Sequence, residues 1–369
     1  MALILNGTDG VTFNDSSLQG AAASPFGLKN RIINGDMKID QRRAGASVTV
    51  LTTTGYTLDR FDAVASVSSK YSVQQNAGSV TPPSGYTNYL GVTSLSAYTV
   101  GASENFGIRQ MIEGFNVADL GWGAAGASTV TLSFWVRSSL TGTFGGALAN
   151  NTATRSYPFT YTISAANTWE QKTITIAGDT TGTWEKTNLI GIRLNFGLGS
   201  GASASGTAGA WAGADYFSAT GSTSVVGTNG ATWYITGVQL EIGTSATPFE
   251  RRLYDKELAS CQRYYLRLNS GAQTAYTSFG MGVAYTTTAA SITVNYPVQM
   301  RANPTYNAGN SLRLVGSGVT AVTSSSLGQT SYLSSYITVN VASGLTTNNA
   351  YWFGPNGDST AYIDFTAEL

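Results

Sequence analysis

The feature that most constrains this chain is strict alternation of apolar and polar side chains. In residues 129–137, TVTLSFWVR, the alternation has the period of a half-buried strand. The apolar positions are Val130, Leu132, Phe134 and Val136. Residues 170–176 and 233–242 show similar alternation and are separated from the first stretch by loops rich in Gly, Thr, Ser and Asn. This spacing predicts an antiparallel β-sandwich whose core is filled by alternate residues of two sheets.

Shorter alternating stretches extend the pattern over most of the chain. The first part predicts strands at 71–75, 89–93, 108–112, 157–163 and 189–196, and a long loop at 197–230. The last part predicts strands at 274–286, 291–298, 311–315, 335–341 and 361–365. We therefore expect an all-β protein with two β-sandwich, jelly-roll-like domains, at 29–248 and 266–369.

One stretch, residues 249–265, predicts a helix, which we expect to connect the two domains. Leu253, Leu258 and Cys261 share one face of it, and charged side chains occupy the rest. The chain has no histidine to act as a base for a thiol. Cys261 is therefore expected to be a small buried hydrophobe, not a nucleophile.

Residues 1–28 form a separate N-terminal segment with two short apolar patches around turn-forming Asn-Gly and Asp-Gly pairs. It is too short to fold alone. Two interpretations stay open, a frayed terminus and an extended arm that adds strands to a neighbouring subunit or a larger particle. In the second, the attachment residues are Leu3, Leu5, Val11 and Phe13.

Charge and residue types exclude several classes of function. Only 11% of the residues are charged, 20 positive and 20 negative, against about 25% in typical domains. So little charge argues against nucleic acid or an anionic membrane as a partner, and no apolar run is long enough to insert into a membrane. Without histidine and with one cysteine, imidazole-based zinc sites, Ser-His-Asp triads and disulfide frameworks are excluded. We expect no cofactor and no bound metal.

Several motifs together carry a resemblance to known families. The Asn34-Gly35-Asp36 turn, the strand at 130–136, Trp169 before KTITI and the stretch at 234–241 resemble carbohydrate-binding jelly-roll modules. With ATPFERR at 246–252 and ELASCQRYY at 257–265, residues 29–265 look more specifically like bacteriophage tail-fibre and virion structural proteins. The opening LNGTDGVTF resembles phage fibre N-termini.

The resemblance implies a location and partners. It implies a virion appendage that is made in the host cytoplasm, attaches to other virion proteins by its N-terminal arm, assembles as a homotrimer and binds a host surface glycan. In such sugar-binding modules an acidic residue after the NG turn and an Asp in the last strand often hold calcium. Here these positions are Asp36 and Gly237, so the chain departs from that pattern.

Three aromatic residues in the long loop are the candidate ligand-binding residues, namely Trp211, Tyr216 and Phe217. One interpretation is that they plug the loop onto the edge of the sandwich. The other is that they form a platform on which a sugar ring stacks, while Asn, Thr and Ser hydrogen-bond the hydroxyl groups.

Two other functions remain as alternatives to glycan binding. One is a purely structural capsid or tail component without a ligand. The other, a glycan depolymerase, requires paired carboxylates. Pairs such as Asp36 with Asp40, or Glu170 with Asp179, can be named, but no spacing singles one out. We therefore predict that the protein is not an enzyme and assign no catalytic residues.

Overall fold

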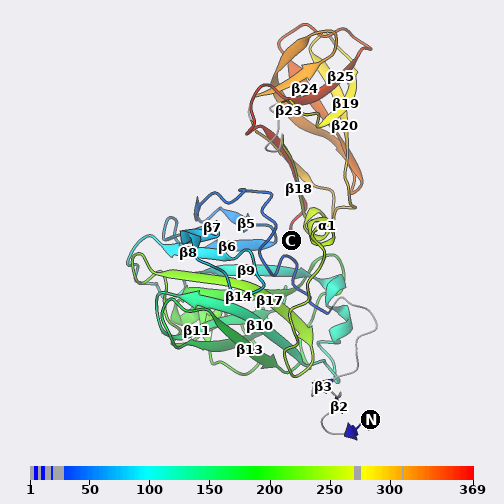
Figure 1. Ribbon diagram of the computed structural model, residues 1–369. Coiled ribbons are helices and arrows are strands. Elements are labelled where there is room, and N and C mark those ends of the chain that lie inside the picture. The colour runs from blue at the N-terminus through cyan, green and yellow to red at the C-terminus, as the bar shows by residue number, and fades with distance from the viewer. Residues whose placement is uncertain (1–3, 7–9, 13–17, 20–28, 270–275, 310) are drawn as a thin grey trace.

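The computed structural model shows two β-domains with a short helix between them (Figure 1). It describes residues 1–369 except 1–3, 7–9, 13–17, 20–28, 270–275 and 310. One large apolar core draws on residues between Ile32 and Leu240, and a second on residues between Leu266 and Ala367. The all-β prediction with a connecting helix is confirmed.

The first domain is a sandwich of two six-stranded sheets. The first sheet has the order β13 (Glu170–Ile176), β10 (Val130–Ser138), β17 (Thr232–Ile242), β8 (Leu90–Ser94), β7 (Tyr71–Gln75) and β4 (Val48–Thr49). The second has the order β12 (Ser156–Ile163), β11 (Gly142–Ala149), β14 (Ile190–Ser200), β9 (Asn105–Glu113), β6 (Phe61–Ala65) and β5 (Gly55–Leu58). All their strand pairs are antiparallel.

Alternation along β10 explains why this strand is central. Leu132 and Phe134 are 0% exposed, and Phe134 makes edge-to-face contacts with Tyr161 and Phe196 of the opposite sheet, both at 5.1 Å between ring centroids. The intervening side chains, among them Trp135, point to the outer face. Burial of one face thus fixes the register of the strand.

Residues 201–231 cover the second sheet, with 3-10 helix Ala202–Ala204 and the short parallel pair β15 (Ser205–Gly206) and β16 (Ser218–Ala219). Glycines in the sheet allow this close approach. A Cβ atom on Gly145 would lie 2.2 Å from Ser222 Oγ, and one on Gly107 would lie 2.3 Å from the Phe217 ring. The remaining 3-10 helices are Ala77–Ser79, Gly114–Asn116 and Ala118–Leu120.

The second domain is a closed six-stranded barrel, where the sequence predicts two opposed sheets. Its order is β19 (Gly280–Ala284), β20 (Ala289–Asn295), β24 (Ser334–Val341), β23 (Val319–Thr330), β22 (Leu312–Val315) and β25 (Ala350–Pro355). A three-stranded sheet adjoins it, with the order β18 (Tyr265–Asn269), β26 (Tyr362–Thr366) and β21 (Thr305–Ala308). The barrel closes because its first strand in the sequence, β19, pairs with its last, β25.

Helix α1 (Tyr254–Gln262) and β18 lie between the sandwich and the barrel (Figure 1). Buried ion pairs hold this junction together. Glu368 binds Arg60 and, at 2.7 Å, Arg42, while Glu113 binds Arg263 at 2.6 Å. Cys261 is fully buried, and burial raises the pKa of its thiol well above the usual value.

The N-terminal strands β1 (Ile4–Asn6), β2 (Gly10–Thr12) and β3 (Leu18–Gln19) form a small antiparallel sheet of their own. Leu5 is paired with Val11 in it. The other two predicted attachment residues, Leu3 and Phe13, lie outside the described residues. No helix in the described part of the chain has the length and apolar character needed to cross a membrane.

Candidate functional site

The seven tryptophans separate into two groups by what their indole N–H does. Five donate it to the protein: Trp122, Trp169, Trp184, Trp211 and Trp233. Within the described residues, the structure shows no hydrogen bond or ring contact for Trp135 or Trp352. Buried indoles almost always find a partner. These two are therefore the tryptophans that the fold leaves available.

Trp135 lies on the outer face of the first sheet, in the middle of a polar row. It is partly exposed, and the residues directly across from it are Gln171 of β13 and Thr236 of β17. Gln171 and the next outward residue of β13, Thr173, are exposed. An accessible aromatic surface thus lies beside amide and hydroxyl groups.

A loop of residues 80–88 borders this surface. Thr236 donates its hydroxyl to the Asn88 carbonyl at 2.7 Å, which fixes the loop beside Trp135. The β10–β17 ladder shifts register between Ser133 and Trp135, and Gly237 of β17 has φ +62° there. A Cβ atom on Gly237 would lie 2.6 Å from the Tyr86 hydroxyl, so the bulge makes room for the Tyr86 ring.

We call the surface formed by Tyr86, Asn88, Trp135, Gln171 and Thr173 the Trp135 surface. None of the five carries a formal charge at neutral pH, and partial burial raises the pKa of Tyr86 further above its usual value. The indole offers a flat apolar face, while the surrounding amides and hydroxyls can both donate and accept hydrogen bonds. The arrangement suits a neutral ligand with an apolar face and a hydroxyl rim.

The three aromatic residues predicted from the long loop lie elsewhere. Trp211 packs edge-to-face on Trp122 at 5.3 Å and on Trp184 at 5.4 Å between ring centroids, and donates its N–H to the Ala177 carbonyl at 2.8 Å. The Tyr216 ring fills the space beside Gly206, where a Cβ atom would lie 2.2 Å from it.

Phe217 is 8% exposed and packs against Gly107, so its ring is covered and offers no open stacking face. The prediction of Phe217 as a stacking platform is corrected here, because the glycines of the second sheet let the ring sink into the sandwich. The geometry of all three residues is that of a loop plugged onto the sandwich. Trp211 and Tyr216 keep some exposure, and their glycan role stays a prediction.

Carboxylates of the described residues are engaged with partners. Of the pairs named from the sequence, Asp36 binds Lys38 at 2.6 Å, and Asp40 accepts the backbone N–H groups of Arg43 and Gly45. Glu170 and Asp179 bind Lys172 and Arg155, each at 2.6 Å.

Burial alone would raise the pKa values of Glu170 and Asp179, but the hydrogen bonds from their partners hold both values below the usual range. A general acid in glycoside hydrolysis needs the opposite shift.

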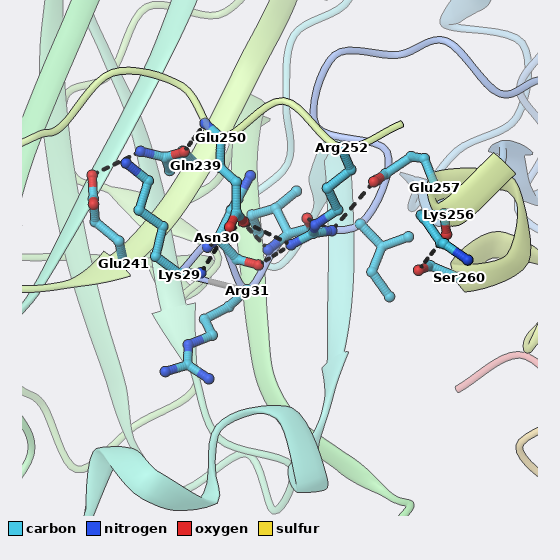
Figure 2. A network of polar contacts seen from close by, with 12 residues as sticks. Lys29, Asn30, Arg31, Gln239, Glu241, Glu250, Arg252, Lys256, Glu257 and Ser260 are labelled. Atoms are coloured by element: carbon cyan, nitrogen blue, oxygen red, sulfur yellow. Dashed lines mark hydrogen bonds and ion pairs between the residues drawn. The ribbon is translucent and has the colours of Figure 1, made fainter. Parts of the chain in front are cut away.

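Figure 2 shows a largely part-buried network that ties the start of the first domain to β17 and α1. Glu250 accepts the backbone N–H groups of Lys29 and Asn30 at 3.1 and 3.0 Å. Arg252 lies between Glu250 and Glu257, 3.3 Å from each, and also donates to the Asn30 carbonyl. Burial raises the pKa of Glu257, while Arg252 lowers it. Glu250 and Glu257 therefore make structural contacts between the start of the first domain and α1.

The described residues contain no group of three or more His, Cys, Asp or Glu side chains placed to hold a metal ion. At the two positions compared with calcium-binding modules, Asp36 is neutralised by Lys38, and Gly237 forms the bulge under Tyr86. Both positions are therefore used in other ways.

Sequence reasoning missed Trp135 as a site residue although a signal was present. The alternation at 129–137 places Phe134 inside and Trp135 outside, beside outward Thr131 and Ser133. A tryptophan on the polar face of a strand is the unusual feature. The partner across the sheet, Gln171, became known only through the register of β10 and β13.

No family profile matches the chain, and no curated protein matches it in sequence. Among solved structures, the enzymatically active domain of tailspike protein 4 from bacteriophage CBA120 is similar, with a TM-score of 0.32 at 9% identity, over 58% of this chain and 21% of that one.

A family 11 carbohydrate-binding module from Clostridium thermocellum, in complex with a β-1,3-1,4-mixed-linked tetrasaccharide, has a TM-score of 0.27 at 9% identity, over 55% of this chain and 99% of its own. The tandem CBM22 domains of Paenibacillus barcinonensis Xyn10C have a TM-score of 0.27 at 9% identity, over 89% and 100%. At these values the neighbours carry no argument about what this chain binds.

Proposed function

We propose that this chain is a glycan-binding protein and that the Trp135 surface is where the glycan binds. The observation that carries the proposal is the partly exposed Trp135, whose indole N–H has no hydrogen-bond partner among the described residues. Sugars present apolar faces and hydroxyl rims, which match an aromatic ring flanked by amides and hydroxyls. The five residues of the surface carry no formal charge, which favours a neutral glycan, and the charge at its border is Arg251, whose guanidinium lies over the Tyr86 ring at 4.8 Å from the centroid.

We further propose that the chain is part of a virion, as a tail fibre or a similar appendage, and that the glycan lies on the host surface. This part rests on the sequence resemblance of residues 29–265 and of LNGTDGVTF near the start. The small sheet β1–β3 suits an attachment role toward other virion proteins, because it pairs only with itself in the described residues. A homotrimer is the expected assembly.

A glycan array of neutral bacterial surface oligosaccharides tests the binding site. We expect salt-resistant binding by the wild-type chain and loss of at least about 2 kcal/mol, roughly thirtyfold in affinity, for Trp135→Ala. Trp211→Ala is the matched control, since this tryptophan uses its N–H inside the fold. Unchanged binding by Trp135→Ala, or no binding by wild type to any neutral glycan, would overturn the proposal.

A further inference from the structure

Apolar side chains form a continuous row across the outer wall of the barrel. Val319 of β23 is paired with Val315 of β22, Val315 with Trp352 of β25, and Trp352 with Met281 of β19. Val283 lies two residues from Met281 on the same face of β19. We call these five residues the apolar stripe.

The stripe faces outward and is well exposed. Met281 is 63% exposed, Val319 59% and Trp352 45%. The neighbours of Val315 and Trp352 along the chain that face the core, Leu314 and Phe353, are 0% exposed. The barrel core is therefore filled by other residues. Contiguous exposed apolar side chains on a soluble protein mark a surface that binds something.

The wall around the stripe carries almost no charge. On the six barrel strands, all of whose residues the structure describes, Arg313 is the only charged residue, and its guanidinium lies over the Tyr276 ring at 4.5 Å from the centroid. Apart from Arg313, this wall offers no counter-charges to a partner of ordinary composition, about a quarter of whose residues are charged. Such a partner would bury unpaired charges at a cost.

The barrel is closed, so it has no free strand edge at which a partner can add a strand. Association through this wall must use side chains packed face to face. The apolar stripe on another copy of the chain is a surface of the same apolar and nearly uncharged composition. Most soluble oligomers are closed and symmetric, so a patch that lies at the symmetry axis meets its own copies, in a pair in a dimer and three together in a trimer.

We propose that the apolar stripe is the surface through which copies of this chain associate. The proposal names the contact that the expected assembly uses and does not depend on the Trp135 surface. Trp352 lies at the centre of the row, where interface tryptophans contribute most.

Sedimentation velocity of the full chain from about 1 to 50 µM tests it, with variants that place the same negative charge at two points of one barrel. Trp352→Glu introduces it into the stripe. Ser326→Glu introduces it at an exposed position of β23, seven residues beyond Val319 and so about 23 Å away along the strand.

We expect wild type and Ser326→Glu to sediment as the same multiple of the 38.6-kDa chain. Trp352→Glu should raise the dissociation constant at least about a hundredfold and sediment as a monomer with an unchanged far-UV circular dichroism spectrum. A monomeric wild type, or an associated Trp352→Glu, would overturn the proposal. The proposal would also be overturned if Trp352→Glu kept the mass of the wild-type assembly but lost glycan binding, since the stripe would then be a ligand surface. The mass measurement involves no glycan, so its failure leaves the Trp135 proposal untouched.

Discussion

Replacing Glu368 by Gln should weaken the junction between the domains more than any exposed charge substitution. The Glu368 side chain is 6% exposed and binds Arg60, which is 1% exposed, and Arg42, at 2.7 Å. Gln keeps the shape but removes the charge. Arg60 then has only neutral partners, namely the amide oxygen of the new side chain, the Met111 carbonyl at 2.5 Å and the Tyr264 ring at 3.6 Å from its centroid.

Breaking a buried ion pair costs about 3–5 kcal/mol, because the remaining charge stays buried without a counter-charge. The Tyr264 ring retains part of the interaction, so we expect the free energy of unfolding to fall by about 3 kcal/mol. Urea denaturation followed by tryptophan fluorescence measures this value.

Asp119→Asn is the matched control for this substitution. Asp119 binds Arg31 at 2.6 Å, a similar distance, but its side chain is 53% exposed. An exposed pair is worth at most about 1 kcal/mol. Equal losses for the two variants would refute the reasoning, because burial would then not determine the cost.

Three further substitutions test separate parts of the structure. Burial raises the pKa of Asp59 from 3.8 to about 7, against the opposing effects of Arg42 and of the hydrogen bonds from Gln41. The native state therefore holds this proton more tightly than the unfolded state, and stability should fall by up to about 4 kcal/mol as the pH rises from about 4 to 7. Asp59→Asn should remove that fall in urea titrations at pH 5 and 8, and an unchanged pH dependence would contradict it. Gly237→Ala should lower the free energy of unfolding by about 2 kcal/mol, because the residue has φ +62° and the new methyl group meets the Tyr86 hydroxyl; an unchanged melting temperature would argue against the bulge. Trp211→Ala should cost about 3 kcal/mol in thermal unfolding through lost aromatic packing while glycan binding is retained; the reverse result would restore its predicted ligand role.

Alternation made much of the sandwich predictable. The strands at 71–75 and 170–176 have the predicted bounds, because burial of one face imposes a period of two on their sequences. Strand β11, GTFGGALA, shows no such period and was not predicted. Its Gly145 and Gly146 have no side chain to alternate, since the covering loop and the Phe159 ring occupy that space.

Barrel closure and the site depend on long-range register, which local patterns do not encode. Met281 and Trp352 are 71 positions apart in the sequence. Their pairing closes the barrel and brings both side chains into the apolar stripe. In the same way, Gln171 and Thr236 reach Trp135 only through the pairing of three strands. The loop aromatics stand out in the sequence as large side chains among small residues, but the contact that covers Phe217 depends on Gly107 in the distant strand β9.

The most direct test of the account compares glycan affinity for Trp135→Ala and Trp211→Ala on one array of neutral bacterial surface oligosaccharides. The account predicts roughly thirtyfold weaker binding for Trp135→Ala and wild-type binding for Trp211→Ala. Full binding by Trp135→Ala together with loss of binding by Trp211→Ala would contradict it and move the site to the long loop.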